Sequence, residues 1–492
     1  MSLQALLAAR AHQEGKAQST ALYRHRAIAD DPLCIVAWQL GAEPYSPGAL
    51  AFGRESSGFQ LYVPGYPLQR DLLFAALLEF AKNFCPAFEA YAAGPCEYRE
   101  YKGKVLAVPL ALPQIVVAND ETIRLIGRLG RRLAYLSTTG QFAADPLLPR
   151  LGRHFMWIAN HAHLPGQQLI LSVAGLLGSH YATAMSALEV QSLTAMDAWV
   201  APPSGIHGFH AAELAEDHPV GPVPKPKDGE QVHALMQDFN KARAGSTDPA
   251  LVKNLAAPLF DLYGDMVEET WSLIWKVINR ERHKPEAGFV ARRVGEDRLK
   301  YAEHLDWMMG PADGRRKARL TPYGAAVRLN ELESSNTLVA AEEAIDDPLR
   351  MLPHLLTGKA LAGIVLNCNP FRTEVVGGRN CKRPSVTIRT EVPCQMPGGT
   401  ELWWTSASGE KEWLVAEVTP SGGGSEVTLI LQTNRAQKAG LPAIGVRACF
   451  SQFNTRPGYE LHLPSQAPWT HQPAAPPETT DLEYNDSTEE AA

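Results

Sequence analysis

Residues 361–406 read LAGIVLNCNPFRTEVVGGRNCKRPSVTIRTEVPCQMPGGTELWWTS, and the pattern that they start continues to residue 469. Short apolar runs alternate here with turn residues such as Gly377-Gly378. Apolar runs of this length between turns predict β-strands, which we place at residues 361–367, 385–390, 401–406, 413–418, 427–433 and 446–450. The stretch therefore predicts a small antiparallel β-barrel over residues 359–470, a fold that hosts many unrelated functions.

The length and charge of the chain limit its class. A chain of 492 residues predicts two to four domains of about 100 to 200 residues each. The formal net charge is -7, and six carboxylates fall within residues 472–492, where no Lys or Arg occurs. We expect residues 471–492 to be a disordered acidic tail. The rest of the chain is close to neutral, so its charge does not exclude an anionic ligand.

The cysteines and apolar segments indicate the compartment. The 7 cysteines include no CxxC pair, which is more typical of buried thiols in a reducing cytoplasm than of disulfides or a zinc ribbon. The N-terminus lacks the apolar core of a signal peptide, and no apolar run of about 18 residues occurs. We therefore expect a cytoplasmic protein without a membrane span.

Residues 1–140 predict an α/β domain. Three strands at residues 34–39, 49–53 and 59–63 precede a helix at residues 71–84. Two more strands, at residues 105–108 and 114–117, lead to a helix that starts at Asp120. This order of strands and helices resembles that of RNase H-like nuclease domains.

The resemblance concerns topology alone. Nucleases of this kind need several carboxylates to hold two metal ions about 3.5 to 4 Å apart. The first strand carries Val36, Ala37, Trp38 and Gln39 instead. We expect a degenerate domain that has lost catalysis.

Residues 141–358 predict a helical domain, so the whole chain is predicted to be an α+β multidomain protein. The pattern is helical and strongly apolar over residues 147–200. Prolines then predict a long loop over residues 201–228, because proline fixes its own φ and disfavours helix in the residue before it. Helices resume near residue 231, and a partly acidic one at residues 325–357 leads to the barrel.

A first basic stripe lies on the helix that starts at Asp120. Apolar residues recur on one side of this helix, and the other side carries Arg124, Arg128, Arg131 and Arg132. Arginines three and four residues apart share a helix face. The stripe is either a solvated surface or a face that contacts phosphates.

A second basic segment lies between residues 280 and 319. It holds eleven Lys and Arg against seven Asp and Glu, with Tyr301 and Trp307 inside it and Trp271 and Trp275 next to it. Such a segment can neutralise phosphates and stack on bases, although a salt-bridged helix face gives the same pattern. The candidate contacts here are Arg292, Arg293, Arg315, Arg316, Lys317 and Arg319. In the barrel, Lys382 and Arg383 are further candidates, because they lie in a basic loop near two tryptophans.

Histidines give the alternative of a metal centre. His161 and His163 form an HxH pair, and His207 and His210 lie in the proline-rich region. Two such histidines and a carboxylate can hold a catalytic metal. No HExxH motif occurs. Histidines at helix ends also serve as hydrogen-bonded structural groups.

Nucleotide-binding motifs are missing from the sequence. Neither GxxxxGK[ST] nor a GxGxxG after a strand occurs, so we expect no cofactor. If ATP drives the system, another polypeptide binds it. The sequence favours a non-enzymatic, nucleic-acid-associated accessory protein that acts with a separate ATPase, helicase or nuclease. The alternatives are a scaffold with protein partners only, and a metal-dependent hydrolase or nuclease that uses the histidines.

Overall fold

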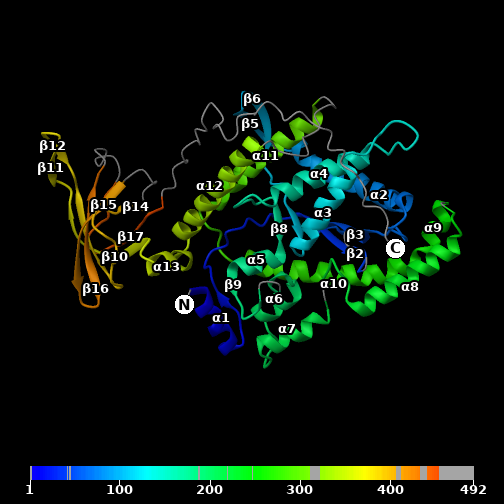
Figure 1. Ribbon diagram of the computed structural model, residues 1–492, viewed down its shortest axis with the longest axis horizontal. Coiled ribbons are helices and arrows are strands. Elements are labelled where there is room, and N and C mark those ends of the chain that lie inside the picture. The colour runs from blue at the N-terminus through cyan, green and yellow to red at the C-terminus, as the bar shows by residue number, and fades with distance from the viewer. Residues whose placement is uncertain are drawn as a thin grey trace, which may run out of the picture.

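The computed structural model describes residues 3–41, 43, 46–186, 189–218, 220–246, 248–310, 322–405, 412–432 and 440–453. Within these ranges, a larger α/β body precedes a closed β-barrel. Figure 1 shows the barrel at one end of the molecule, joined to the body by α12 (Pro322–Asp346) and α13 (Pro348–Leu356).

A five-stranded sheet forms the centre of the body. Its order is β4 (Gly58–Tyr62), β3 (Pro47–Arg54), β2 (Leu33–Gln39), β7 (Ile115–Val117) and β8 (Ile170–Ser172). β2, β3 and β4 are antiparallel neighbours, whereas β7 and β8 run parallel to β2. Every residue of β2 is buried, as expected for a strand covered on both faces.

Helices cover both faces of the sheet. Alternate residues of β2 separate two cores: Leu33, Ile35 and Ala37 face one, and Cys34, Val36 and Trp38 face the other. The first core contains α2 (Arg70–Glu89), α3 (Asp120–Leu133), α4 (Leu147–His161) and part of α11 (Val290–Met309). The second contains α5 (Val173–His180), α6 (Leu193–Val200), α8 (Pro226–Arg243), α9 (Pro249–Leu255) and α10 (Ala257–Arg282).

The central sheet contains strands from both sides of the boundary predicted at residue 140. β8 pairs with β7, so residues on both sides of the predicted boundary share one sheet and its two cores. β8 lies inside the run predicted to be helical over residues 147–200. Its three residues are too few to produce a strand period, and a short apolar run is ambiguous between strand and helix.

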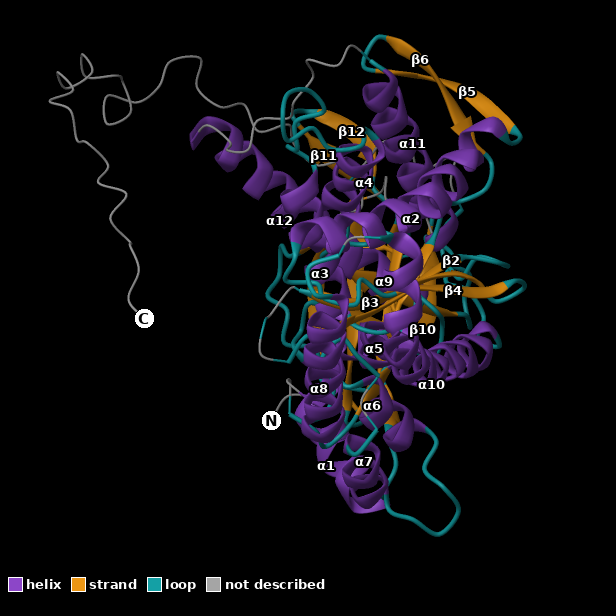
Figure 2. Ribbon diagram, turned by 90° about the vertical axis from the view of Figure 1, so that its right-hand side faces the viewer, coloured by secondary structure: helices purple, strands orange, loops and turns teal. Residues whose placement is uncertain are grey.

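Two other predictions in the body need correction. Residues 105–108 belong to β6 (Lys104–Pro109), which pairs with β5 (Cys96–Tyr101) in a separate hairpin instead of joining the sheet. The predicted loop over residues 201–228 contains α7 (Gly208–Glu216), because this segment has no proline and His207 caps it by accepting a hydrogen bond from the Phe209 N–H. Figure 2 shows the β5–β6 hairpin protruding beside α11.

The barrel agrees with its prediction. Its strands, in order around the barrel, are β10 (Ala360–Asn369), β13 (Ser385–Thr390), β16 (Gly424–Leu431), β15 (Glu412–Ser421), β14 (Glu401–Trp404) and β17 (Arg447–Ser451). Alternate side chains such as Val427, Leu429 and Leu431 point inward. Trp413 and Phe450 meet edge to face at 5.4 Å between ring centroids. β11 (Thr373–Val376) and β12 (Arg379–Lys382) form a hairpin outside the barrel wall.

The remaining described elements lie at the edge of the body. α1 (Leu3–Glu14) precedes β1 (Gln18–Ser19), which pairs with β9 (Tyr181–Ala182), and short 3-10 turns occur at Ala90–Ala93 and Glu189–Gln191. None of the helices in the described ranges combines the length and apolar character that a bilayer-spanning segment requires.

Candidate nucleic-acid interface

Helices α3 and α4 cross closely because small residues lie at the contact. A Cβ atom added to Gly130 would lie 2.6 Å from the backbone nitrogen of Met156. A Cβ atom on Gly152 would lie 2.3 Å from the backbone nitrogen of Ala134. Both distances are shorter than non-bonded contacts allow, so only glycine permits this approach of the two backbones.

A groove of ≈ 240 Å³ opens beside this crossing. It is lined by Ile123, Arg124, Gly127, Arg128 and Arg131 on the α3 side, and by Met156, Ala159, Asn160 and His163 on the α4 side. Three of the four arginines predicted on this helix therefore line a single groove. None of the described lining residues is an Asp or Glu, so the groove is a positively charged surface.

The sequence of α3 directs its arginines outward. The side chain of Asn119 caps the helix by accepting a hydrogen bond from the Thr122 N–H at 3.1 Å. Ile126 and Leu129 on the opposite side are each 1% exposed. The predicted separation of apolar and basic faces is confirmed. Arg131 and Arg132 in the last turn also complement the negative end of the helix dipole.

The arginines differ in how they are matched. Arg124 forms an ion pair with Glu121 one turn earlier on the exposed face. Arg131 and Arg132 are exposed, and within the described ranges no carboxylate lies at ion-pair distance from either. Arg132 is next to the groove but does not line it, because it is rotated by about 100° from Arg131 on the helix.

Hydrogen bonds from side chains of α4 to Glu89 and Asp297 hold the helix in place. His154 Nε2 lies 2.6 Å from Glu89 Oε1, and Arg150 binds both oxygens of Glu89 at 2.7 and 2.6 Å. Burial lowers the pKa of His154. His161 Nε2 lies 2.9 Å from Asp297 Oδ1 and thereby links α4 to α11. These contacts fix the position of α4, and with it the outer face that lines the groove, relative to α2 and α11.

Sequence reasoning missed the second wall of the groove. Asn160 and His163 are exposed, and both belong to the surface that faces the arginines of α3. His163 is predicted as a metal ligand in the sequence, and Asn160 is not predicted at all. The available signal is spacing, because Met156 and Asn160 lie four residues apart on one face of α4, and His163 follows just after the helix ends at His161.

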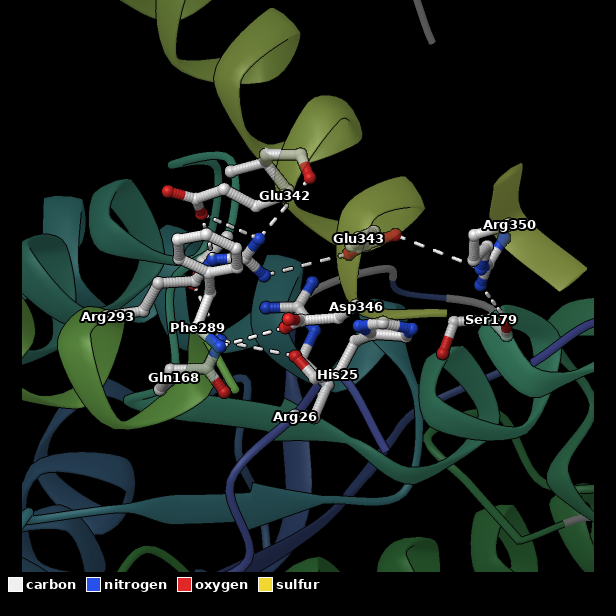
Figure 3. Close-up of polar contacts among 12 residues, drawn as sticks. His25, Arg26, Gln168, Ser179, Phe289, Arg293, Glu342, Glu343, Asp346 and Arg350 are labelled. Atoms are coloured by element: carbon white, nitrogen blue, oxygen red, sulfur yellow. Dashed lines mark hydrogen bonds and ion pairs between the residues drawn. The ribbon is translucent and has the colours of Figure 1, made fainter. Parts of the chain in front are cut away.

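The surroundings of Arg292 and Arg293 do not support contact with phosphate. Arg293 is 4% exposed, and its Nε and Nη2 atoms each lie 2.9 Å from Glu342 Oε2. Arg292 pairs with Glu296 and Glu342. Figure 3 shows Arg293 beneath the acidic end of α12, between Glu342 and Glu343. These ion pairs attach α12 to α11. The charges of Arg292 and Arg293 are therefore neutralised within the protein and need no bound phosphate.

The other predicted cations are separated from the groove. Arg315, Arg316, Lys317 and Arg319 lie outside the described residues. Lys382 is exposed at the end of β12, and Arg383 donates to the carbonyl of Gln432. Figure 1 places β12 at the end of the molecule remote from α3 and α4.

The histidines do not converge on one point. His161 is buried against Asp297, whereas His163 is exposed in the groove. His207 Nε2 lies 2.9 Å from the carbonyl oxygen of His12, and its Nδ1 accepts from the Phe209 N–H. His210 lies 3.0 Å from Glu213 on the surface. In the described part of the chain, no group of three or more His, Cys, Asp or Glu is placed to hold a metal ion.

Comparisons of the chain with protein-family models, with curated proteins and with solved structures found no match.

Proposed function

We propose that this chain is a nucleic-acid-associated accessory protein without a catalytic centre of its own, acting with a separate ATPase, helicase or nuclease. The observation that carries the proposal is the α3–α4 groove, whose described lining contains Arg124, Arg128 and Arg131 and no carboxylate. Contacts between arginine and phosphate supply most of the affinity in nucleic-acid binding that is independent of sequence.

The form of the groove suits a polyanion better than a single small anion. Arginines three and four residues apart place their charges in a row along the helix. Asn160 and His163 on the other wall add hydrogen-bonding groups opposite that row. Such contacts fix the position of a phosphate backbone and carry no information about the base sequence. The groove would therefore hold nucleic acid for a partner that selects or processes it.

We further propose that the body is a degenerate RNase H-like domain. Three antiparallel strands, β2 to β4, precede α2, and then β7 and β8 extend the same sheet parallel to β2. In open α/β sheets, ligands bind outside the carboxyl ends of the strands. The carboxyl ends of β2 and β7 are where a nuclease site in such a sheet is expected.

The chain itself covers this edge. The carbonyl of Gly221 accepts a hydrogen bond from the Asn119 side chain at 2.7 Å, and the carbonyl of Pro222 accepts one from the Gln39 N–H at 2.7 Å. Ser172, at the end of β8, caps α5 through the Gly175 N–H. The Asn119 and Ser172 side chains and the Gln39 N–H thus form hydrogen bonds within the chain at the edge where a nuclease would hold its metal ions. This supports an accessory role without catalysis.

Fluorescence anisotropy of labelled oligonucleotides tests the proposal. Binding to DNA or RNA is expected at low salt, and Arg128→Gln with Arg131→Gln should weaken it by about tenfold or more. Arg10→Gln with Lys82→Gln is the matched control, because it removes two exposed, ion-paired cations elsewhere. Absence of binding at low salt, or equal losses in both variants, would refute the proposal.

A scaffold with protein partners is the second candidate, favoured by the β5–β6 hairpin. Tyr98 is 75% exposed and Val105 is 70% exposed. Both belong to the outer face of the hairpin, because the opposite face, with Leu106 and Val108, packs against α11. Loss of a co-purifying protein on Tyr98→Ser with Val105→Ser, with nucleic-acid binding absent in the unaltered chain, would select this role.

A further inference from the structure

The hairpin of β11 and β12 forms a solvent-exposed two-stranded ribbon. Its register pairs Thr373 with Lys382 and Val375 with Asn380. Gly377 and Gly378 have φ values of 56° and 78°, and two successive positive φ values form the tight turn that suits a twisted hairpin. All residues of β11 and all but one of β12 are exposed. Figure 1 shows this ribbon protruding from the barrel.

One face of the ribbon offers groups that can read a base pair. Because side chains alternate along a strand, Thr373, Val375, Asn380 and Lys382 lie on the same face. This face carries a hydroxyl, an amide, an ammonium group and an apolar side chain that is 68% exposed, and it has no carboxylate. Amide groups bind adenine edges, lysine binds guanine or phosphate, and apolar groups contact the thymine methyl.

The charge of the ribbon favours an anionic partner. Residues 369–384 contain four cations, Arg372, Arg379, Lys382 and Arg383, and one acid, Glu374. Glu374 pairs with Arg372 at 3.2 Å. Among the residues that the structure describes, no carboxylate lies at ion-pair distance from Arg379 or Lys382.

A second hairpin in the same chain provides a contrast. The cations at the tip of the β5–β6 hairpin are matched by α11, since Lys102 lies 2.7 Å from Glu303 and Lys104 lies 2.9 Å from Asp306. That hairpin also packs on α11 through Leu106 and Val108. The cations of an exposed hairpin in this protein can therefore be paired, whereas Arg379 and Lys382 of the β11–β12 hairpin have no carboxylate at ion-pair distance within the described part of the chain.

The dimensions of the ribbon suit the major groove of B-form DNA. That groove is about 12 Å wide and about 8.5 Å deep, and it admits a two-stranded ribbon. Strands lie about 4.8 Å apart, and four residues extend about 13 Å. The major groove of an A-form RNA duplex is too deep and narrow for side chains to read. The ribbon should therefore distinguish the two duplexes.

We infer that the β11–β12 ribbon enters the major groove of double-stranded DNA. Thr373, Val375 and Asn380 face the bases there, while Arg379 and Lys382 contact phosphates. This inference rests on the proposed nucleic-acid function and deepens it, because it names duplex DNA as the partner of the barrel. The α3–α4 groove supplies a separate contact with the phosphate backbone.

Anisotropy titrations of the full chain test the ribbon. The probes are a DNA duplex, an RNA duplex of the same sequence and a DNA single strand. We expect the DNA duplex to bind about tenfold tighter than the RNA duplex. Asn380→Ala with Lys382→Gln should weaken DNA-duplex binding by about tenfold, as the loss of one good base contact would, and leave single-strand binding unchanged. Tyr98→Ser with Lys104→Gln is the matched control on the β5–β6 hairpin and should change neither.

The outcomes separate this inference from the proposed function. Equal binding of the two duplexes, or a ribbon variant that binds DNA like the unaltered chain, overturns the inference even if the Arg128 and Arg131 variant loses binding. A dimer that dissociates on the ribbon substitutions assigns the ribbon to self-association and also overturns it. No binding of any probe removes both proposals. Unchanged circular dichroism of the variants ensures that affinity, not folding, is compared.

Discussion

Single glycines allow the groove between α3 and α4 to form, although no charge pattern points to them. Gly130→Ala would place a Cβ atom 2.6 Å from the Met156 nitrogen. The helices must then move apart, at a cost of about 1 to 3 kcal/mol in the free energy of unfolding. Gly295→Ala is the matched control in α11, because nothing lies within 4 Å of its Cβ position. It should stabilise by about 0.5 to 1 kcal/mol.

Urea unfolding followed by tryptophan fluorescence measures both changes. The two Gly→Ala substitutions should change the free energy of unfolding in opposite directions. The Cβ position of Gly130 is blocked by the backbone of Met156, whereas that of Gly295 is open. A stabilisation of the same size at both positions would show that helix propensity, not close packing, decides the effect at Gly130.

Glu281 should make stability depend on pH. It is fully buried and accepts hydrogen bonds from Tyr181 and His180, with Lys284 nearby at 3.3 Å. Burial alone would raise the pKa of Glu281, but the His180 hydrogen bond and the Lys284 charge outweigh it and lower the pKa to about 2. A lowered pKa stabilises the fold above the ordinary value of 4.5. That contribution, on the order of 3 kcal/mol, is lost as pH falls from 4.5 to about 2.

Glu281→Gln checks this dependence. The variant should be less stable than the unaltered chain at neutral pH, and the difference should shrink as pH falls through that window. Glu230→Gln changes an exposed side chain on α8 and should leave the pH profile unaltered. A stability difference between Glu281→Gln and the unaltered chain that stays constant with pH would contradict the role given to Glu281.

The residue scale also shows where prediction from the sequence succeeds. The arginine stripe of α3 follows from local spacing, so its exposed face is predictable. Arg293 has a similar local pattern, yet Glu342 lies far along the chain and covers it. Only the tertiary fold distinguishes a buried arginine with an ion-pair partner, such as Arg293, from an exposed arginine on the surface, such as Arg131.

The attachment of α12 to α11 is tested at the scale of elements. Arg293 and Glu342 are 4% and 2% exposed. Glu342→Gln would leave the guanidinium buried without its main counter-charge, which costs about 3 to 5 kcal/mol. Earlier protease cleavage near α12 and a lower thermal midpoint are the expected readouts.

A double variant is the control for that attachment. Replacing both partners, as Arg293→Met with Glu342→Leu, removes the unpaired charge and should recover much of the lost stability. If the double variant is as unstable as Glu342→Gln, packing of the side chains and not charge explains the loss.

Elements were predictable in proportion to their length and period. The barrel strands alternate clearly and lie between glycine-rich turns, so their positions follow from the sequence. β8 has three residues and no period of its own. α7 is not predicted, because prolines flank it on both sides, although the helical segment itself lacks proline. Pairing of β5 with β6 instead of the sheet depends on α11, which comes much later in the chain.

At the scale of the whole molecule, the barrel has a core separate from the two cores of the body. We expect two unfolding transitions in calorimetry, because cooperative units follow separate cores. Trp413→Ala should lower the barrel transition, and Ile274→Ala should lower the body transition, since both side chains are fully buried. A single transition that both variants shift equally would show one cooperative unit.

The salt dependence of nucleic-acid binding tests the central claim most directly. The slope of log Kd against log salt concentration reports the number of phosphates neutralised. For the unaltered chain and for Arg128→Gln with Arg131→Gln, we predict slopes that differ by about one for each phosphate contact removed. The same slope for both proteins would contradict the claim that the α3–α4 groove binds the phosphate backbone.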